Sequence, residues 1–190
     1  MEILRHGDSS ELTITPEKWK EFLDYYRTHR DALISEAALA RDNGVSHRNF
    51  KVGCALISVE PGLKEGEYAV YSAHNFTPTP ANRTGWEKRC AERNAVEAAI
   101  EKGAFFIPAM VSVSRETSTG DETTKAHDVL HPCLNCREML RELMKTGVLR
   151  DESIICNVND AEKPERNIPY VVEEKTLKQL LEMYKDDPGT

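Results

Sequence analysis

Two short segments of metal-binding character constrain this chain more than any other feature. The first reads Cys90-Ala-Glu92, and the second, Pro132-Cys-Leu-Asn-Cys136, carries two cysteines at the C-x-x-C spacing of metal ligands. A catalytic zinc takes three protein ligands and leaves the fourth position for water, whereas a structural zinc usually takes four. If the fold brings Cys90 to Cys133 and Cys136, the three thiols form a three-ligand site, and Glu92 is well placed beside the metal as an unligated proton carrier. This pattern favours a hydrolytic zinc site over a structural one.

Both segments are predicted to begin helices, over residues 90–102 and from residue 132 to the glycine at 147. Helix N-termini favour negative charge, so they lower the cost of holding thiolates. Three thiolates around a dication leave a net negative shell, which a nearby cation should offset. Arg93 and Arg137 directly follow the two motifs and are candidates for this role through N–H···S contacts. The alternative for each is an ordinary solvated arginine on a helix.

The remaining sequence alternates predicted strands and helices. Thr15-Pro16-Glu17 is typical of a helix start, and the helical pattern continues to Asn43-Gly44, with a possible break near residues 29–30. This alternation predicts a single α/β domain over residues 1–190, with helices on both faces of one sheet. Strands are expected at residues 50–59, 67–74, 105–114, 153–158 and 168–172, and a last amphipathic helix at 176–184.

Length, charge and cysteine usage narrow the class of protein. The 190 residues suffice for one well-filled core, and no apolar run approaches the roughly 18 residues needed to cross a bilayer. The net charge of −7 disfavours a nucleic-acid partner, because phosphate neutralisation supplies most non-specific affinity. The N-terminus lacks the pattern of a secretory signal, and five cysteines are an odd number, so we expect a cytoplasmic protein without a disulfide framework. Cys54 and Cys156 are interpreted as small hydrophobic residues inside strands.

Three stretches together resemble the cytidine deaminase family. They read Phe50-Lys-Val-Gly-Cys-Ala-Leu, Cys90-Ala-Glu-Arg-Asn-Ala-Val and Pro132-Cys-Leu-Asn-Cys-Arg-Glu, in the order in which the family has them. The similarity extends over about residues 33 to 184, including a late strand and a terminal helix that begins at Thr176. The Cys-Ala-Glu form resembles the free-nucleoside branch, which includes blasticidin-type deaminases. Deaminases that edit polynucleotides, and cytosine or guanine deaminases, usually carry histidine at the first ligand.

The resemblance implies a three-layer α/β/α fold with a five-stranded mixed sheet and hydrolytic deamination of an aminopyrimidine. It implies that Cys90, Cys133 and Cys136 bind Zn²⁺, and that Glu92 moves a proton from water to the ring nitrogen and then to the departing amine. On this basis residues 31–185 form the deaminase core and residues 1–30 an N-terminal helical extension. The resemblance also implies a homo-oligomer, a tetramer or dimer, whose neighbours complete each pocket.

One departure concerns the substrate. Nucleoside deaminases of this branch carry Asn-x-Glu-Asn after the second strand, where the Asn and Glu hold the ribose. Here the matching residues are Asn75-Phe76-Thr77-Pro78, so the asparagine is kept and Thr77 replaces the carboxylate. The connections at 60–66, 75–88 and 115–131 are also longer than usual and are expected to frame the pocket mouth. Phe50 and Asn75 remain candidates for substrate binding, with plain core packing as the alternative for Phe50.

These observations predict a zinc-dependent deaminase of a cytosine-bearing nucleoside or related aminopyrimidine. Two alternatives stay open: a deaminase of single-stranded nucleic acid or of a nucleotide, and a metal-stabilised binding module without catalytic activity. His131 is a further candidate ligand or pocket residue, although an ordinary loop histidine is the simpler interpretation. His74 and Trp86 flank the altered segment and are candidates for stacking on a base, with ordinary packing as the alternative.

Overall fold

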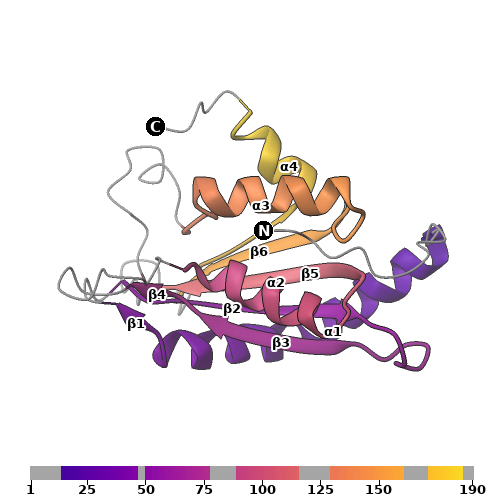
Figure 1. Ribbon diagram of the computed structural model, residues 1–190, viewed down its shortest axis with the longest axis horizontal. Coiled ribbons are helices and arrows are strands. Elements are labelled where there is room, and N and C mark those ends of the chain that lie inside the picture. The colour runs from indigo at the N-terminus through magenta and orange to yellow at the C-terminus, as the bar shows by residue number, and fades with distance from the viewer. Residues whose placement is uncertain (1–13, 47–49, 78–88, 116–128, 161–170, 186–190) are drawn as a thin grey trace.

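The computed structural model describes residues 14–46, 50–77, 89–115, 129–160 and 171–185 (Figure 1). The N-terminus, the C-terminal tail, Trp86, the Thr77 side chain and most of the predicted loops at 75–88 and 115–131 lie outside this part of the chain. In chain order the elements are α1 (Pro16–Asp42), β1 (Val45–Ser46), β2 (Val52–Val59), β3 (Ala69–His74), β4 (Phe76–Thr77), α2 (Ala91–Glu101), β5 (Phe106–Ser114), α3 (Leu134–Lys145), β6 (Ile154–Asn159), β7 (Val171–Thr176) and α4 (Leu177–Glu182).

The five longer strands form one mixed sheet in the order β3-β2-β5-β6-β7. Strands β5 and β6 are parallel and are connected through α3, whereas the other neighbouring pairs are antiparallel. The turn between β2 and β3 contains Gly62 and Gly66, both with positive φ, which glycine adopts without steric cost. A separate two-residue ladder pairs β1 with β4. The five-stranded mixed sheet of the predicted three-layer fold is confirmed.

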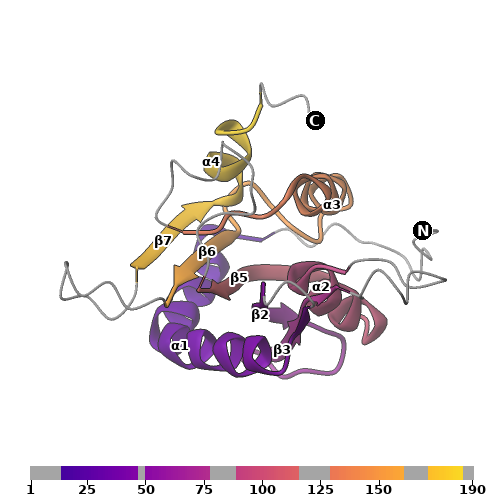
Figure 2. The same ribbon diagram turned by 90° about the vertical axis from the view of Figure 1, so that its left-hand side faces the viewer.

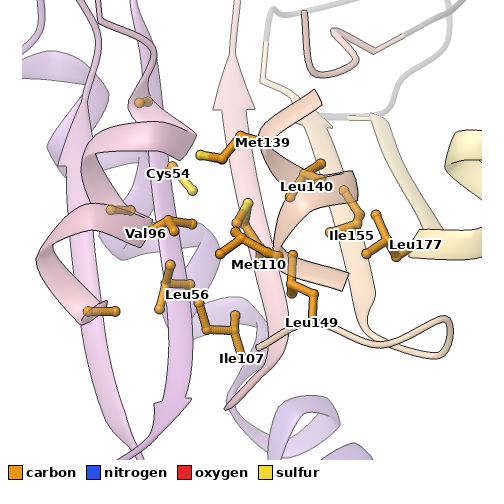
Figure 3. Packing of buried hydrophobic residues seen from close by; sticks show 14 of the residues in the cluster. Cys54, Leu56, Val96, Ile107, Met110, Met139, Leu140, Leu149, Ile155 and Leu177 are labelled. Carbon is orange, nitrogen blue, oxygen red and sulfur yellow. The ribbon is translucent and has the colours of Figure 1, made fainter. Parts of the chain in front are cut away.

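Helices cover both faces of the sheet, as Figure 2 shows. Helix α1 packs on one face, where Leu33 and Ala37 meet alternate residues of the strands such as Ala55 and Val111. Helices α2, α3 and α4 pack on the other face, and Figure 3 shows Val96 and Leu140 of this cluster near the sheet. Both faces are apolar because the strands are buried on both sides, as expected for the centre of a three-layer domain.

Helix α1 is continuous across residues 29–30, so the break considered there is wrong. Thr15 caps the helix by accepting a hydrogen bond from the Lys18 amide, and Pro16 occupies the first turn. The helix lies very close to β2: a Cβ placed on Gly53 would lie 1.8 Å from the Ala37 carbonyl oxygen. Only glycine permits this approach, which holds the start of β2 against the helix.

Two boundaries near the C-terminus differ from the sequence prediction. Strand β7 runs over Val171–Thr176, later than the expected strand at 168–172, whose first three residues lie outside the described part of the chain. Thr176 then ends the strand and caps α4, where its hydroxyl and the Gln179 side chain form a reciprocal capping box.

Among the helices that the structure describes, none is long and apolar enough to cross a membrane.

Candidate zinc centre

The beginnings of α2 and α3 supply the predicted metal site. Cys90 is the N-cap residue of α2, and Cys133 is the N-cap residue of α3. Both have extended backbone conformations, so the helical turn starts at the next residue and Cys136 falls within the first turn of α3. The positive ends of two helix dipoles therefore lie at the three thiols, where they favour the thiolate form that binds metals.

The three cysteine sulfurs converge. They all lie within 4.8 Å of one another, and the sulfurs of Cys90 and Cys133 are 3.4 Å apart. Tetrahedral zinc with Zn–S bonds of about 2.3 Å requires sulfurs about 3.8 Å from one another, so the donor set fits zinc in both chemistry and spacing. In the described residues this metal-ligand group comprises Cys90, Cys133 and Cys136 alone. Three protein ligands leave one tetrahedral position for water.

Glu92 lies beside this group without belonging to it. The residue sits in the first turn of α2, is only 6% exposed, and places its carboxylate Oε2 3.7 Å from the Cys136 sulfur. A carboxylate at the edge of a three-thiol site can exchange protons with a molecule held at the open position. The predicted separation of roles between Glu92 and the three cysteines is consistent with this geometry.

The thiols resist ionisation when no cation is near them. The neighbouring Cys133 thiol, burial and the charge of Glu92 raise the pKa of Cys90 to about 12. The pKa of Cys136 is also raised, first by its contact with Cys133 and then by Cys90, burial and Glu92. Several negative charges cannot be held together in this buried space without a compensating positive charge. A divalent cation is the natural source of that charge.

On the sheet face that α2 and α3 cover, three neighbouring strands carry buried side chains with polar atoms. Cys54 of β2 pairs with Ser112 of β5, which pairs with Asn157 of β6, and all three side chains are buried. These three residues form one row across the sheet. The neighbouring row on the same face, two residues away along each strand, is apolar and consists of Leu56, Met110 and Ile155. Burial, followed by the charge of Glu92, raises the pKa of the Cys54 thiol well above its usual range.

This polar row identifies where the sheet faces the metal site. Sequence analysis did not single out Ser112 or Asn157, although polar residues at inward positions of two apolar strands were a readable signal. Cys54 and Cys156 are both buried, which confirms their interpretation as core residues. Cys156 lies on the opposite face of the sheet, in the cluster that α1 covers.

The family model for the cytidine and deoxycytidylate deaminase zinc-binding region matches residues 27–149, well over half of the chain. The chain therefore belongs to the cytidine and deoxycytidylate deaminase family. Its fold resembles that of cytidine deaminase from Burkholderia pseudomallei, with a TM-score of 0.54 and 22% identity over 79% of this chain and 94% of that chain. Cytidine deaminase from Mycobacterium leprae gives a TM-score of 0.49 at 22% identity, over 80% of this chain and 95% of that chain. No curated protein matches the sequence.

Asn75 of this family member is tied to the backbone at the start of β2. Its side-chain oxygen accepts a hydrogen bond from the Val52 amide at 2.8 Å, and its side-chain nitrogen donates to the Phe50 carbonyl at 2.8 Å. The next residue, Phe76, forms two backbone hydrogen bonds with Arg89, directly before the first metal ligand. Asn75 therefore links the entrance of β2 to the segment that carries the metal site.

Phe50 and His74 occupy the same region. Phe50 is partly buried and packs against the core cluster on the face of α2 and α3. The backbone carbonyl of His74 accepts a hydrogen bond from the Asn94 side chain of α2 at 2.8 Å, which fixes this segment to the helix. The structure thus brings both candidate substrate residues, Phe50 and Asn75, to the strand ends beside α2.

The two candidate arginines differ in their surroundings. Arg93 is half-buried, and its side chain forms no hydrogen bond or ion pair within the described part of the chain. Arg137 is only 6% exposed, donates a hydrogen bond to the Pro132 carbonyl at 3.0 Å, and lies over the Tyr184 ring at 4.0 Å. The interpretation of Arg137 as a solvated helix arginine is therefore wrong.

His131, interpreted as an ordinary loop residue, is also buried, with 3% exposure.

Proposed function

We propose that this protein is a zinc-dependent hydrolase that deaminates a cytosine-bearing nucleoside, such as cytidine or deoxycytidine, or a related aminopyrimidine nucleoside. The observation that carries the proposal is the convergence of three cysteine sulfurs with a buried, unligated carboxylate from a second helix. Family membership supports the reaction type, and the Cys-Ala-Glu form of the first motif supports a free nucleoside as substrate.

Cys90, Cys133 and Cys136 would hold the zinc ion. When bound, zinc supplies Lewis-acid chemistry that lowers the pKa of a coordinated water from about 15.7 to about 7. Arg93 is half-buried in the first turn of α2, and Arg137 is buried in the first turn of α3. Both guanidinium groups belong to the two helix turns that hold the thiolates, and we propose that they offset part of the negative charge there.

Glu92 performs the proton transfers in this proposal. Its carboxylate accepts a proton from the attacking water and delivers it to the ring nitrogen next to the carbon that bears the amine. A second proton, from the hydroxyl group that the attack places on that carbon, then passes to the departing amine as the C–N bond breaks, so that water and the aminopyrimidine yield the carbonyl compound and ammonia. General acid–base transfer of this kind contributes typically about 10²- to 10⁴-fold to rate. Burial of Glu92 among helix ends fixes the carboxylate in position for both steps.

Phe50 and Asn75 are the proposed substrate-side residues. Asn75 keeps the asparagine of the family pattern, but its side chain also orders residues 50–52 through two backbone hydrogen bonds. Since Thr77 stands in place of the ribose-binding carboxylate, we propose that the sugar is held by other groups than in ordinary nucleoside deaminases. The net charge of −7 supports an uncharged substrate over a polynucleotide.

An ammonia-release assay on a panel of compounds tests this function. The panel contains cytidine, deoxycytidine, deoxycytidylate, free cytosine, a blasticidin-like nucleoside and a cytosine-containing oligonucleotide. We expect turnover of at least one nucleoside and none of the oligonucleotide. Activity confined to the oligonucleotide or the nucleotide would overturn the substrate class, and inertness of zinc-loaded protein toward every compound would favour a binding module.

We also propose that the protein is a homo-oligomer, a dimer or tetramer, in a reducing compartment such as the cytoplasm. The resemblance of the Cys-Ala-Glu motif to the free-nucleoside deaminases supports an oligomer. All five cysteines are free, which supports the reducing compartment. Sedimentation analysis of the zinc-loaded protein measures the assembly directly, and a monomer at micromolar concentration would contradict the proposed oligomer.

A further inference from the structure

His131 directly precedes the segment that carries two of the zinc ligands, and its buried ring contacts two distant elements. Its Nδ1 lies 2.5 Å from the Tyr184 hydroxyl, and its Nε2 contacts the Glu173 carboxylate. A carboxylate only accepts hydrogen bonds, so Nε2–H donates to Glu173. In the neutral ring, Nδ1 is then left to accept from the Tyr184 hydroxyl. Both ring nitrogens are thus engaged away from the three sulfurs.

Arg137 attaches the other end of the same segment to the same tyrosine. Its guanidinium lies 4.0 Å from the centre of the Tyr184 ring and donates a hydrogen bond to the Pro132 carbonyl at 3.0 Å. The chain from His131 to Arg137, which contains Cys133 and Cys136, is therefore held at both ends by Tyr184. A cation over an aromatic face is worth more when it is buried, as here, than at an exposed site.

The partners in this arrangement are themselves fixed by the C-terminal elements. Glu173 lies in β7, where it is opposite Asn157 of β6, and it also forms an ion pair with Lys175 at 2.8 Å. Tyr184 follows α4 and is 5% exposed. The sheet and the last helix thus provide a rigid base for the ligand segment, although they are far from it in sequence.

We propose that His131, Arg137, Glu173 and Tyr184 form a clamp that positions Cys133 and Cys136 for zinc, so that the C-terminal strand and helix set the affinity of the metal site. The proposal rests on the proposed zinc site, and none of the four is a ligand. His131, Glu173 and Tyr184 are positioning residues that act through the backbone of the ligand segment. Loss of such outer contacts typically weakens metal binding about 10- to 100-fold.

The test measures zinc affinity of the full-length protein by competition with a chromogenic chelator. Tyr184→Phe removes one hydroxyl and keeps the ring over Arg137, and Glu173→Gln removes a charge while keeping the shape of the side chain. We expect each to weaken zinc binding by about 10-fold or more. The matched control is Glu174→Gln, because Glu174 is the next residue of β7 but contacts Tyr26 and Arg30 of α1 on the other face of the sheet. It should change zinc affinity less than about twofold.

Two further readouts separate positioning from a general loss of stability. In the cobalt-substituted protein, the sulfur-to-cobalt absorption should shift or weaken in Tyr184→Phe and Glu173→Gln but not in Glu174→Gln, at temperatures where all are folded. A double variant of Tyr184→Phe with His131→Gln should lose little more affinity than His131→Gln alone, because His131→Gln already breaks the contact with the Tyr184 hydroxyl.

Wild-type zinc affinity and an unchanged cobalt spectrum in both Tyr184→Phe and Glu173→Gln would overturn the clamp. Its failure is distinguishable from failure of the proposed function. A wild-type protein that binds zinc and weakens as expected in the variants, yet deaminates no compound, overturns only the proposed function. A wild-type protein that deaminates nucleosides while the variants bind zinc normally overturns only the clamp.

Discussion

The Glu92 carboxylate lies 3.7 Å from the Cys136 sulfur, although the two residues belong to the first turns of different helices. This contact joins the two halves of the site, because α2 contributes the acid and one thiol while α3 contributes the other two. Neither helix could form the site alone. The sheet brings their N-termini together, since α2 packs over β2 and β3 and α3 connects β5 with β6.

Replacement of this acid should separate chemistry from metal binding. In Glu92→Gln we expect the rate of ammonia release to fall by about 10²- to 10⁴-fold, because the amide cannot accept and return a proton. Zinc content by elemental analysis should remain one per chain, since the ligand group contains only cysteines in the described residues. Glu97→Gln is the control, because Glu97 lies on the same helix and pairs with Arg89 instead. Loss of zinc in Glu92→Gln would assign Glu92 to the metal shell.

Zinc uptake by the metal-free protein should release protons. The raised pKa values of Cys90, at about 12, and of Cys136 mean that both thiols are protonated near neutral pH and must lose a proton to bind the ion. Apparent zinc affinity should therefore increase with pH, by up to about 100-fold per pH unit for two protons. Calorimetry in buffers of different ionisation enthalpy counts the protons.

The Cys156→Ala variant provides the control for this measurement. Cys156 is buried on the opposite face of the sheet, so its removal should leave the proton count unchanged. Zinc uptake without proton release would show that the thiols are already ionised in the metal-free protein.

Replacement of Asn75 should lower the stability of the folded protein, whether or not the side chain also contacts the substrate. Asn75→Ala leaves the Val52 amide and the Phe50 carbonyl without their side-chain partner, at a cost of about 1–3 kcal/mol for each buried group left unsatisfied. Asn75→Asp keeps the acceptor for Val52 but sets a buried carboxylate oxygen against the Phe50 carbonyl oxygen, so it should cost at least as much. Urea unfolding of the zinc-loaded protein measures both, with Asn43→Ala as the control, because Asn43 bonds a helix carbonyl at an exposed site.

Michaelis kinetics then separate structure from recognition. A rise in KM for Asn75→Asp, measured where the zinc-loaded variant is still folded, would support direct contact with the substrate. An unchanged KM would restrict Asn75 to ordering the start of β2.

The metal ligands and the acid were predictable because their chemistry is local. The spacing of Cys133 and Cys136 within one helix turn and the position of Glu92 two residues after Cys90 can be recognised without knowledge of the fold. The apolar strands β2 and β5 were recognised for the same reason. In contrast, β7 reads Val-Val-Glu-Glu-Lys-Thr, and this edge strand lacks the apolar pattern that marks a central one.

The clamp around His131 was beyond sequence analysis. Its partners Glu173 and Tyr184 lie 42 and 53 residues further along the chain, and no local periodicity connects residues at that separation. A histidine at the end of a predicted loop gives no signal of burial. The sequence made Arg137 a candidate for a place beside the thiolates, but it did not indicate the distant aromatic ring that covers the side chain.

The last prediction concerns the first half of α1. The sequence predicts an N-terminal extension over residues 1–30 and a core that begins at residue 31, so the contribution of this half of the helix to stability can be measured. Phe22 is 1% exposed and lies 5.2 Å from Phe106 and 5.6 Å from Tyr68 between ring centres, so this half of the helix packs on the sheet. Phe22→Ala should lower the free energy of unfolding by about 3–5 kcal/mol. Leu39→Ala on the same helix, at a site 61% exposed, should change it by less than about 0.5 kcal/mol.

Circular dichroism in urea measures both variants, and zinc affinity at low urea should be unchanged in each, because Phe22 contacts the far end of β5 from the metal site. Phe106 begins that strand, whereas Ser112, near its other end, lies in the row beside Cys54. A loss below about 1 kcal/mol in Phe22→Ala would show that the helix before residue 30 is an appendage. A loss in the expected range means that the hydrophobic core of the protein includes that half of the helix.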